Sequence, residues 1–258
     1  MTFHSTTRLF ALLLAAVCLP GAPARAEDPK PADACRTALS AVKAQPGYAA
    51  AYKASIRKTR SDPFEQVGTA VRRGDLLYRE GRREEKGPVS VRLFRLKDRI
   101  AVLDPRTEDE PADRQSWLTA EQAGDPNLGK GLEDPDVAMD FLLDSMAGAT
   151  AGTGTETAGG VPCRPYALAL DKQKLARKVR QQYESAKDLD WEKAEVSAQV
   201  LLGGEPALPR RFRINGVLPT QNRPDESVTL HIEVEVTSYG AAAVPAMPPD
   251  AKEILGAK

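Results

Sequence analysis

Residues 227–239 form the most regular stretch of the chain, Ser-Val-Thr-Leu-His-Ile-Glu-Val-Glu-Val-Thr-Ser-Tyr. Apolar residues from Val228 to Val236 alternate strictly with polar ones. Because successive side chains of a strand point to opposite faces, this pattern predicts a long strand with one buried and one solvated face. A strand of a parallel sheet is usually buried on both faces, so one wet face indicates an antiparallel sheet. We therefore expect an antiparallel sheet around this strand, with helices covering its apolar face.

Weaker patterns predict the other elements. Apolar residues at helical spacing indicate helices from Ala34 to Val42 and around Leu175, Val179 and Tyr183, and Trp117 to Ala120 suggests a short helical piece. The Gly- and Thr-rich segment 147–160 is interpreted as a loop, and 241–249 as a proline-rich tail. Further strands are expected from about Tyr52, at Val71–Tyr78 with a charged hairpin end at Arg79–Gly87, at Val89–Leu93, at Ile100–Leu103, at Tyr166–Leu170, at Ala194–Leu202 and at Phe212–Val217.

The first 26 residues are typical of a secretory signal peptide. Arg8 precedes an apolar run, Leu9 to Leu19, that is shorter than the roughly 20 residues of a membrane-spanning helix. Ala24-Arg25-Ala26 is a small-residue cleavage site, so we expect cleavage after Ala26 and a periplasmic or secreted protein. Cys18 leaves a second interpretation, an outer-membrane lipoprotein anchored through a lipid on that cysteine. After the signal peptide, we expect a linker at residues 27–33, a single domain at 34–250 and a tail at 251–258.

Composition excludes some partners. Lys and Arg number 36, as do Asp and Glu, which gives no electrostatic reason to expect nucleic acid. Hydrophobic residues at 41% suffice for one core of ordinary size.

Beyond the signal segment the cysteines are Cys35 and Cys163. In an oxidising compartment this pair can form a disulfide, with two buried free thiols as the alternative, since sequence does not give their separation.

Little in the chain points to catalysis. His231 is the only histidine after the signal segment, and no Gly-x-Ser-x-Gly, Cys-x-x-Cys or His-Glu-x-x-His motif occurs. His231, Glu233 and Glu235 share the wet face of the predicted strand, where a solvated face is preferred over a metal site. Gly124–Gly131 matches a phosphate-loop spacing but lacks the Ser or Thr that would bind magnesium, so it is interpreted as an ordinary loop. We expect no enzyme, no metal and no cofactor.

Asp134-Pro135 predicts a helix start, with Asp as the cap and Pro in the first turn. The helix runs to about Met146 and is apolar on more than one face, which indicates a core helix or one that faces a ligand.

The predicted helix around Leu175 has a basic face, formed by Lys172, Lys174, Arg177, Lys178 and Arg180. This face is interpreted as solvated, with transient membrane or acidic-partner contact as the alternative. The candidate residues facing a hydrophobic ligand are Val137, Phe141, Leu142, Val228, Leu230, Ile232 and Val234.

The order of elements resembles that of a known family. The supporting segments are Gly160-Val161-Pro162-Cys163-Arg164-Pro165-Tyr166, then Leu208-Pro209-Arg210-Arg211-Phe212, then Val236-Thr237-Ser238-Tyr239-Gly240 before prolines. This layout resembles the exported lipoprotein-carrier superfamily, which includes the periplasmic carrier and outer-membrane receptor of lipoproteins and the mycobacterial lipid-binding lipoproteins. The resemblance implies an α+β fold, a curved antiparallel half-barrel whose helices cover the concave face, where acyl chains are held.

The expected function is therefore that of a non-enzymatic periplasmic carrier or binder of a lipid, a lipoprotein acyl chain or another hydrophobic ligand. The alternative is a structural or interaction protein of the cell envelope with a filled core and no ligand. A cavity on the concave side near the roughly 300 Å³ of a small ligand site would favour the first, and a solid core would favour the second.

Overall fold

The computed structural model describes residues 30–59, 64–84, 88–111, 114–124, 131–132, 134–182, 184–223, 225–240 and 242–257. The predicted signal peptide with Cys18, Tyr183 and most of the Gly124–Gly131 loop lie outside these residues. The helices are α1 (Pro31–Ala41), α2 (Pro135–Ser145), α3 (Lys172–Gln182) and α4 (Pro249–Leu255), with short 3-10 turns η1 (Pro105–Thr107) and η2 (Glu184–Asp188).

The strands within the described ranges join one antiparallel sheet, in the order β6-β5-β4-β3-β2-β1-β12-β11-β10-β9-β7, with β8 paired to β9. Their bounds are β1 Gly47–Lys58, β2 Phe64–Arg73, β3 Leu76–Glu84, β4 Pro88–Leu96, β5 Arg99–Leu103, β6 Trp117–Thr119, β7 Met146–Ala151, β8 Glu156–Ala158, β9 Val161–Leu170, β10 Glu195–Gly203, β11 Leu208–Pro219 and β12 Ser227–Tyr239.

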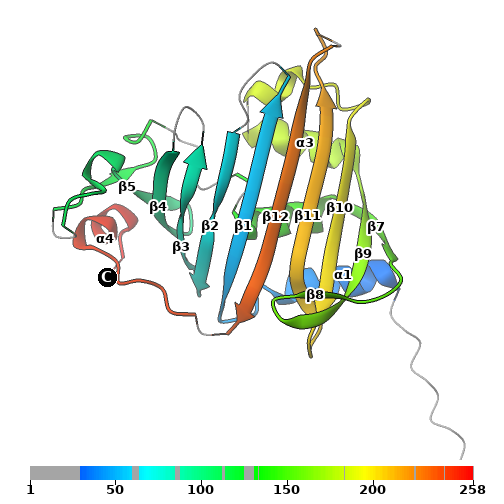
Figure 1. Cartoon of the computed structure of the whole chain (residues 1–258), viewed down its shortest axis with the longest axis horizontal. Coiled ribbons are helices and arrows are strands. Elements are labelled where there is room, and N and C mark those ends of the chain that lie inside the picture. Colours follow the sequence, from blue (N-terminus) through cyan, green and yellow to red (C-terminus); the bar gives the residue numbers. More distant parts are fainter. Residues whose placement is uncertain are drawn as a thin grey trace, which may run out of the picture.

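The sheet curls around a core that lies on its concave face. Figure 1 shows α1 and α3 behind the strands, on this face, while α4 covers the other end of the sheet. The predicted fold class, α+β with a curved antiparallel half-barrel and helices on its concave face, is confirmed. The strand predicted at residues 227–239 is β12, which lies at the centre between β1 and β11.

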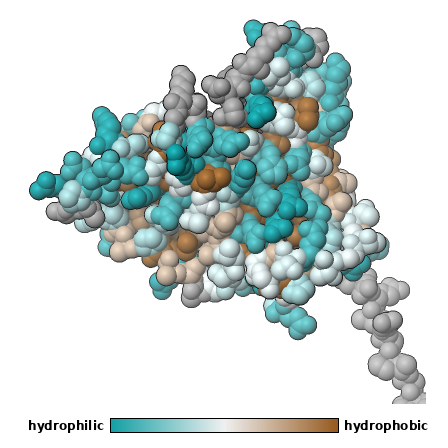
Figure 2. Space-filling model, in the orientation of Figure 1, coloured by the Kyte–Doolittle hydropathy of each residue, from teal (hydrophilic) through white to brown (hydrophobic). Residues whose placement is uncertain are grey.

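The two faces of β12 differ as the alternation predicts. Ile232, Val234 and Val236 are buried in the main hydrophobic cluster under the helices. On the convex face Glu233 pairs with Arg213 at 2.7 Å, and Glu235 accepts a hydrogen bond from Arg211 Nε at 2.9 Å. Figure 2 shows that the convex face is largely hydrophilic over the central strands. The two faces therefore separate the apolar core from a solvated charged surface.

Several predicted elements are wrong in kind or extent. Val71–Tyr78 is not one strand, because Gly74 has a left-handed φ of +59° and turns the chain between β2 and β3. The charged run from Arg79 continues β3 to Glu84 instead of forming the hairpin end. Strand β1 begins at Gly47, before the predicted start near Tyr52.

Other differences involve segments of weak local pattern. Residues around Trp117 form the strand β6, since Trp117 pairs with Leu103 of β5. The segment 147–160, predicted as a loop, supplies β7 and β8 along the edge of β9. Glycine and alanine have low strand propensity, so only pairing with β9 makes these residues strands. The ends differ too, because α1 already begins at Pro31, and α4 occupies residues assigned to a tail.

Cys35 and Cys163 are buried free thiols, so the predicted disulfide is wrong and the alternative holds. Cys35 belongs to the main cluster, whereas Cys163 packs with Ala158 and Leu201. Val200 and Leu202 belong to the concave core, whereas Leu201 points to the opposite face. The Cys35 sulfur therefore lies on the concave face of the sheet, and the Cys163 sulfur lies with Leu201 on the other face. Burial raises the pKa of Cys35 to about 11, which keeps it a thiol at neutral pH.

Candidate functional site

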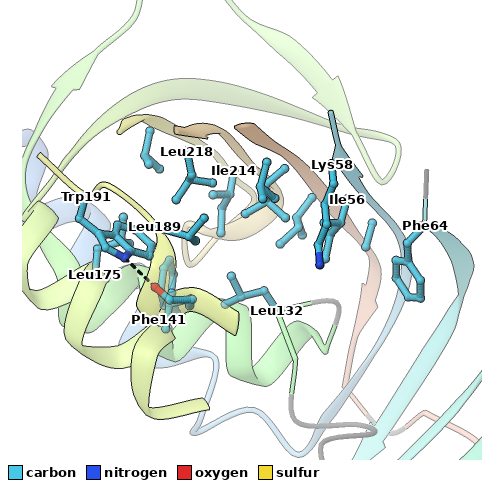
Figure 3. A pocket seen from close by; sticks show the side chains of 17 residues that line it. Ile56, Lys58, Phe64, Leu132, Phe141, Leu175, Leu189, Trp191, Ile214 and Leu218 are labelled. Carbon is cyan, nitrogen blue, oxygen red and sulfur yellow. Dashed lines mark hydrogen bonds between the residues drawn. The ribbon is translucent and has the colours of Figure 1, made fainter. Parts of the chain in front are cut away.

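An apolar cavity of about 170 Å³ lies between the concave face and the helices (Figure 3). The central strands supply one wall, and α2, α3 and the chain around η2 supply the other. The lining residues are Ala54, Ile56, Lys58, Phe64, Leu132, Phe141, Leu175, Val179, Ala186, Leu189, Trp191, Val196, Ile214, Leu218, Val228, Leu230 and Ile232. Lys58 is the one charged residue of this set.

The strand wall follows from side-chain alternation. Ile214 of β11 pairs with Ile232 of β12, which pairs in turn with Ala54 of β1, so one apolar row crosses three strands. The next row along β12 places Leu230 beside Ile56. Val228 and Leu230 are only partly buried although they face inward. They remain accessible because the cavity, and not a helix, lies over them.

Trp191 closes the cavity at the end next to α3. Its Nε1 atom donates a hydrogen bond to the carbonyl oxygen of Ala186 at 3.4 Å (Figure 3). The polar edge of the indole is thereby satisfied, and the aromatic surface is left to line the cavity. Leu175 and Val179, one turn apart on α3, face the same space. This is the apolar stripe that the sequence pattern predicts for the helix.

The opposite end of the cavity is its mouth. Ile56 is 36% exposed, and the neighbouring Phe64 of β2 is partly buried. Figure 3 shows the ammonium end of Lys58 beside Ile56, on the side of the cavity where Phe64 lies. The mouth is therefore apolar with a cation at its edge.

Four of the seven ligand-facing candidates line this cavity, namely Phe141, Val228, Leu230 and Ile232. Leu142 and Val234 are fully buried in the main cluster, and Val137 packs against the outside of that cluster. The structure therefore divides the predicted set into cavity wall and packed core. A period-two pattern cannot make this division, because both kinds of residue point inward.

Sequence reasoning missed most of the wall. Ala54, Ile56 and Phe64 belong to strands whose bounds were misjudged, and Leu132 and Leu189 lie in irregular segments without periodicity. The position of Trp191 could have indicated part of the wall, because a large aromatic residue just before a predicted strand can close one end of an apolar cavity. A second indication was Leu175 with Val179, whose spacing defines the inner face of α3.

A buried ion-pair network fixes α2 against the sheet. Asp134 caps the helix by accepting hydrogen bonds from the backbone N–H groups of Asp136 and Val137, at 3.0 and 3.2 Å. The same carboxylate lies 3.2 Å from Arg95 Nη2 and 4.0 Å from Arg79 Nη1. Burial raises the pKa of Asp134 to about 6, against the opposing effect of both arginines. The network positions α2, and with it Phe141 in the cavity wall.

Tyrosines extend the network across the concave face. Tyr48 donates a hydrogen bond to Asp136 at 2.8 Å, and Arg95 reaches the same carboxylate at 2.9 Å. The guanidinium of Arg79 lies 4.8 Å from the ring centroid of Tyr52. Arg79 and Tyr52 are buried, whereas Arg95 and Asp136 are partly exposed, and none of these side chains lines the apolar cavity. We assign them to holding the helix rather than to binding.

The convex-face histidine is not near the cavity. His231 Nδ1 lies 2.6 Å from Asn215 Oδ1, on the hydrophilic side of β11 and β12. Within the described ranges, no group of three or more His, Cys, Asp or Glu side chains could hold a metal ion. No helix in these ranges has the length and apolarity needed to cross a membrane.

The fold and the cavity together define a protein with one curved antiparallel sheet and an apolar site enclosed by helices. No protein-family model matches the chain, and no curated protein matches it. Among solved structures it is similar to the lipoprotein LppX of Mycobacterium tuberculosis, with a TM-score of 0.43 and 15% identity, over 82% of this chain and 96% of that chain.

Two further solved structures resemble the chain. One is MucB in complex with MucA(peri), with a TM-score of 0.35 and 12% identity, over 85% of this chain and 60% of that chain. The other is a LolA-superfamily protein from Nitrosomonas europaea, with a TM-score of 0.32 and 7% identity, over 83% of this chain and 94% of that chain.

Proposed function

We propose that this protein is a non-enzymatic binder or carrier of a hydrophobic ligand, such as a lipid or the acyl chain of a lipoprotein, outside the cytoplasm. The observation that carries the proposal is the cavity itself, whose described lining is apolar except for Lys58. Each methylene that leaves water for such a site gains about 0.8 kcal/mol. The extracytoplasmic location rests on the predicted signal peptide.

The size of the cavity limits what enters it. A dry apolar cavity of about 150 Å³ is enough to take up benzene, whereas sites for drug-sized ligands start at about 300 Å³. At 170 Å³ the cavity therefore accommodates one end of a single alkyl chain, with the rest of the ligand at the mouth. Because this volume is below the roughly 300 Å³ of a small ligand site, it also supports a second candidate function. In that function the protein binds another envelope protein and its core holds no ligand.

A cavity-filling substitution separates these two functions. Val196 of β10 lines the cavity and is only partly buried, so Val196→Phe should fill the space without disrupting the core. Val217 of β11 is 43% exposed on the convex face, which makes Val217→Phe a matched control. Binding of a long-chain fatty acid and of the alcohol with the same chain would be measured by calorimetry, and co-purified lipid by mass spectrometry.

We expect at least one of the two ligands to bind to the wild-type chain and to Val217→Phe, and Val196→Phe to lose tenfold or more in affinity for it. Circular dichroism would check that both variants are folded. If neither ligand binds and no lipid co-purifies, the carrier proposal is refuted and the filled-core alternative stands.

A further inference from the structure

We infer that Trp191 sets the length limit of the ligand's alkyl chain, because its indole forms the wall on which the end of the chain stops. This inference rests on the proposed function and deepens it, since it names the feature by which the cavity discriminates among hydrophobic ligands. The class of ligand is a single unbranched chain that enters with its methyl end first.

Trp191 separates the cavity from a second hollow on the surface. That hollow is a groove of about 1070 Å³ on the outer side of α3, with Ala176, Arg177 and Gln221 among its lining residues. Leu175 borders the cavity and Ala176 borders the groove, because adjacent positions of a helix point in different directions. Among the described lining residues, Trp191 alone borders both spaces. Only 6% of it is exposed to solvent, so its side chain fills the boundary between them.

Backbone pairing fixes the chain on both sides of Trp191. Before it, the Asp190 N–H donates to the carbonyl oxygen of Pro219 at 2.7 Å, and Leu189 forms a bridge with Thr220. After it, the chain enters β10, which is paired with β9 and β11. The hydrogen bond of the indole N–H described above holds the ring as well. The ring therefore has a fixed place, as a wall that limits chain length requires.

The cavity is long and narrow, with Trp191 at one end. Its lining strands follow the order β2-β1-β12-β11-β10, from Phe64 on β2 to Val196 on β10. Neighbouring strands lie about 4.8 Å apart, so these strands span about 15–20 Å across the curved sheet. Figure 3 shows Trp191 and Phe64 at opposite ends of the labelled side chains. A volume of about 170 Å³ spread over this length admits one unbranched chain and no second one.

The apolar lining makes affinity grow with chain length only as far as the indole. Each methylene that leaves water for the cavity raises the affinity about fourfold. A methylene beyond the indole has no such wall, because the groove on the far side of Trp191 carries exposed charged side chains such as Arg177 and Glu192. Longer chains therefore leave their extra methylenes in water at the mouth, and the affinity reaches a plateau.

Quenching of Trp191 fluorescence tests directly whether the end of the chain reaches the indole. Trp117, the second of the two tryptophans, belongs to a separate cluster, so Trp117→Phe leaves Trp191 as the only tryptophan that emits. Dodecanoate brominated at the methyl end would be compared with dodecanoate brominated next to the carboxylate, because bromine quenches only at short range. At saturation, measured by calorimetry, we expect the first ligand to quench about threefold more strongly than the second.

A chain-length series tests whether the indole sets the limit. Straight-chain fatty acids from hexanoate to tetradecanoate, and the primary alcohols of the same lengths, would compete against a fluorescent fatty acid. For the wild type we expect a gain of about fourfold per methylene, followed by the plateau. Trp191→Phe should start the plateau at a longer chain, and Trp191→Ala at a longer one still, because each leaves more space at the end of the cavity.

Leu230→Ala is the control for a cavity that is merely enlarged. Leu230 lies on β12 in the middle of the lining strands and is only partly buried. We expect Leu230→Ala to lower the affinity for all members of a series by a similar factor and to keep the plateau at the wild-type chain length. Circular dichroism would check that each variant is folded. If Trp191→Ala does not fold, Trp191→Phe and the quenching comparison decide.

The inference is overturned if the two brominated ligands quench Trp191 alike, or if the plateau starts at the same chain length in the wild type and in the folded Trp191 variants. A wild-type affinity that rises over the whole series would overturn it too. Each of these results leaves the proposed function intact, because an alkyl chain still binds. Binding of no member of either series would instead refute the proposed function, and the inference with it.

Discussion

Two glycines on neighbouring strands leave space for a tyrosine side chain on the concave face. Gly68 of β2 and Gly81 of β3 lie opposite each other, and Tyr52 of β1 pairs with Gly68. A Cβ atom on Gly81 would lie 2.4 Å from the carbonyl oxygen of Val67 and 2.6 Å from the hydroxyl of Tyr52. The missing side chains therefore make room for the Tyr52 ring, on which Arg79 stacks before it meets Asp134.

Gly81→Ala should consequently destabilise the protein by about 1–3 kcal/mol, the usual cost of overpacking a tight core site. The matched control is Gly148→Ala in β7, where the nearest atom to a new Cβ would be Ala169 Cβ at 3.9 Å. Urea unfolding followed by circular dichroism measures both. Equal stability of the two variants would show that the close approach over Gly81 is not needed.

At the scale of elements, α4 seals a second apolar surface. Ala251 and Leu255 pack with Trp117, Phe94 and Tyr78, which lie on the face of β3–β6 away from the main core. The Phe94 ring centroid lies 4.9 Å from that of Tyr78 and 5.2 Å from that of Trp117. Without α4 this aromatic cluster would face water. A helix of seven residues is too short to be stable alone, so α4 depends on this contact.

Ala251→Asp should release α4, because it would place a carboxylate at a fully buried position without a partner. In a Trp191→Phe background, we expect the emission of Trp117 to shift to longer wavelength and acrylamide to quench it more strongly. Lys252→Asp, at the adjacent exposed position, is the control and should leave the spectrum unchanged. An unshifted spectrum in Ala251→Asp would mean that α4 does not shield Trp117.

At the scale of the whole molecule, sequence predicts those elements whose signal is local. The alternation in residues 227–239 gives the bounds of β12, and the Asp134 cap gives the start of α2. Strands β6, β7 and β8 were not predictable, because they become strands only by pairing with β5 or β9. The same reason applies to α4, which depends on a surface distant in sequence.

The candidate site was half predictable for a related reason. Alternation identifies Leu230 and Val234 alike as inward-facing, but only three-dimensional packing decides that the cavity lies over Leu230 and that Val234 is sealed. Lys58 was not selected, since its place at the mouth follows from the register between β1 and β12. The alternation within one segment therefore predicts which side chains face inward, whereas the pairing between segments determines which of them line the cavity.

The two ends of the sheet are stabilised by clusters of different size, which predicts different local stabilities. The main cluster joins α1, α2 and α3 to the strands from β7 to β3, whereas β5 and β6 depend on the smaller cluster under α4 and on a small cluster around Leu93 and Ile100. Opening a unit that buries less apolar surface costs less free energy.

We therefore expect backbone amides of β5 to exchange with deuterium before those of β11, because β11 lies between two long strands over the main core, whereas β5 pairs with only the three residues of β6 on its outer side. Hydrogen exchange under native conditions, followed by mass spectrometry of peptides covering residues 99–103 and 208–219, measures the difference. Ala251→Asp should speed exchange in β5 and leave β11 unchanged, since α4 packs on the β3–β6 end of the sheet. If the two peptides instead exchange together in the wild type, and Ala251→Asp accelerates both, the sheet opens as one cooperative unit and the two clusters stabilise it jointly.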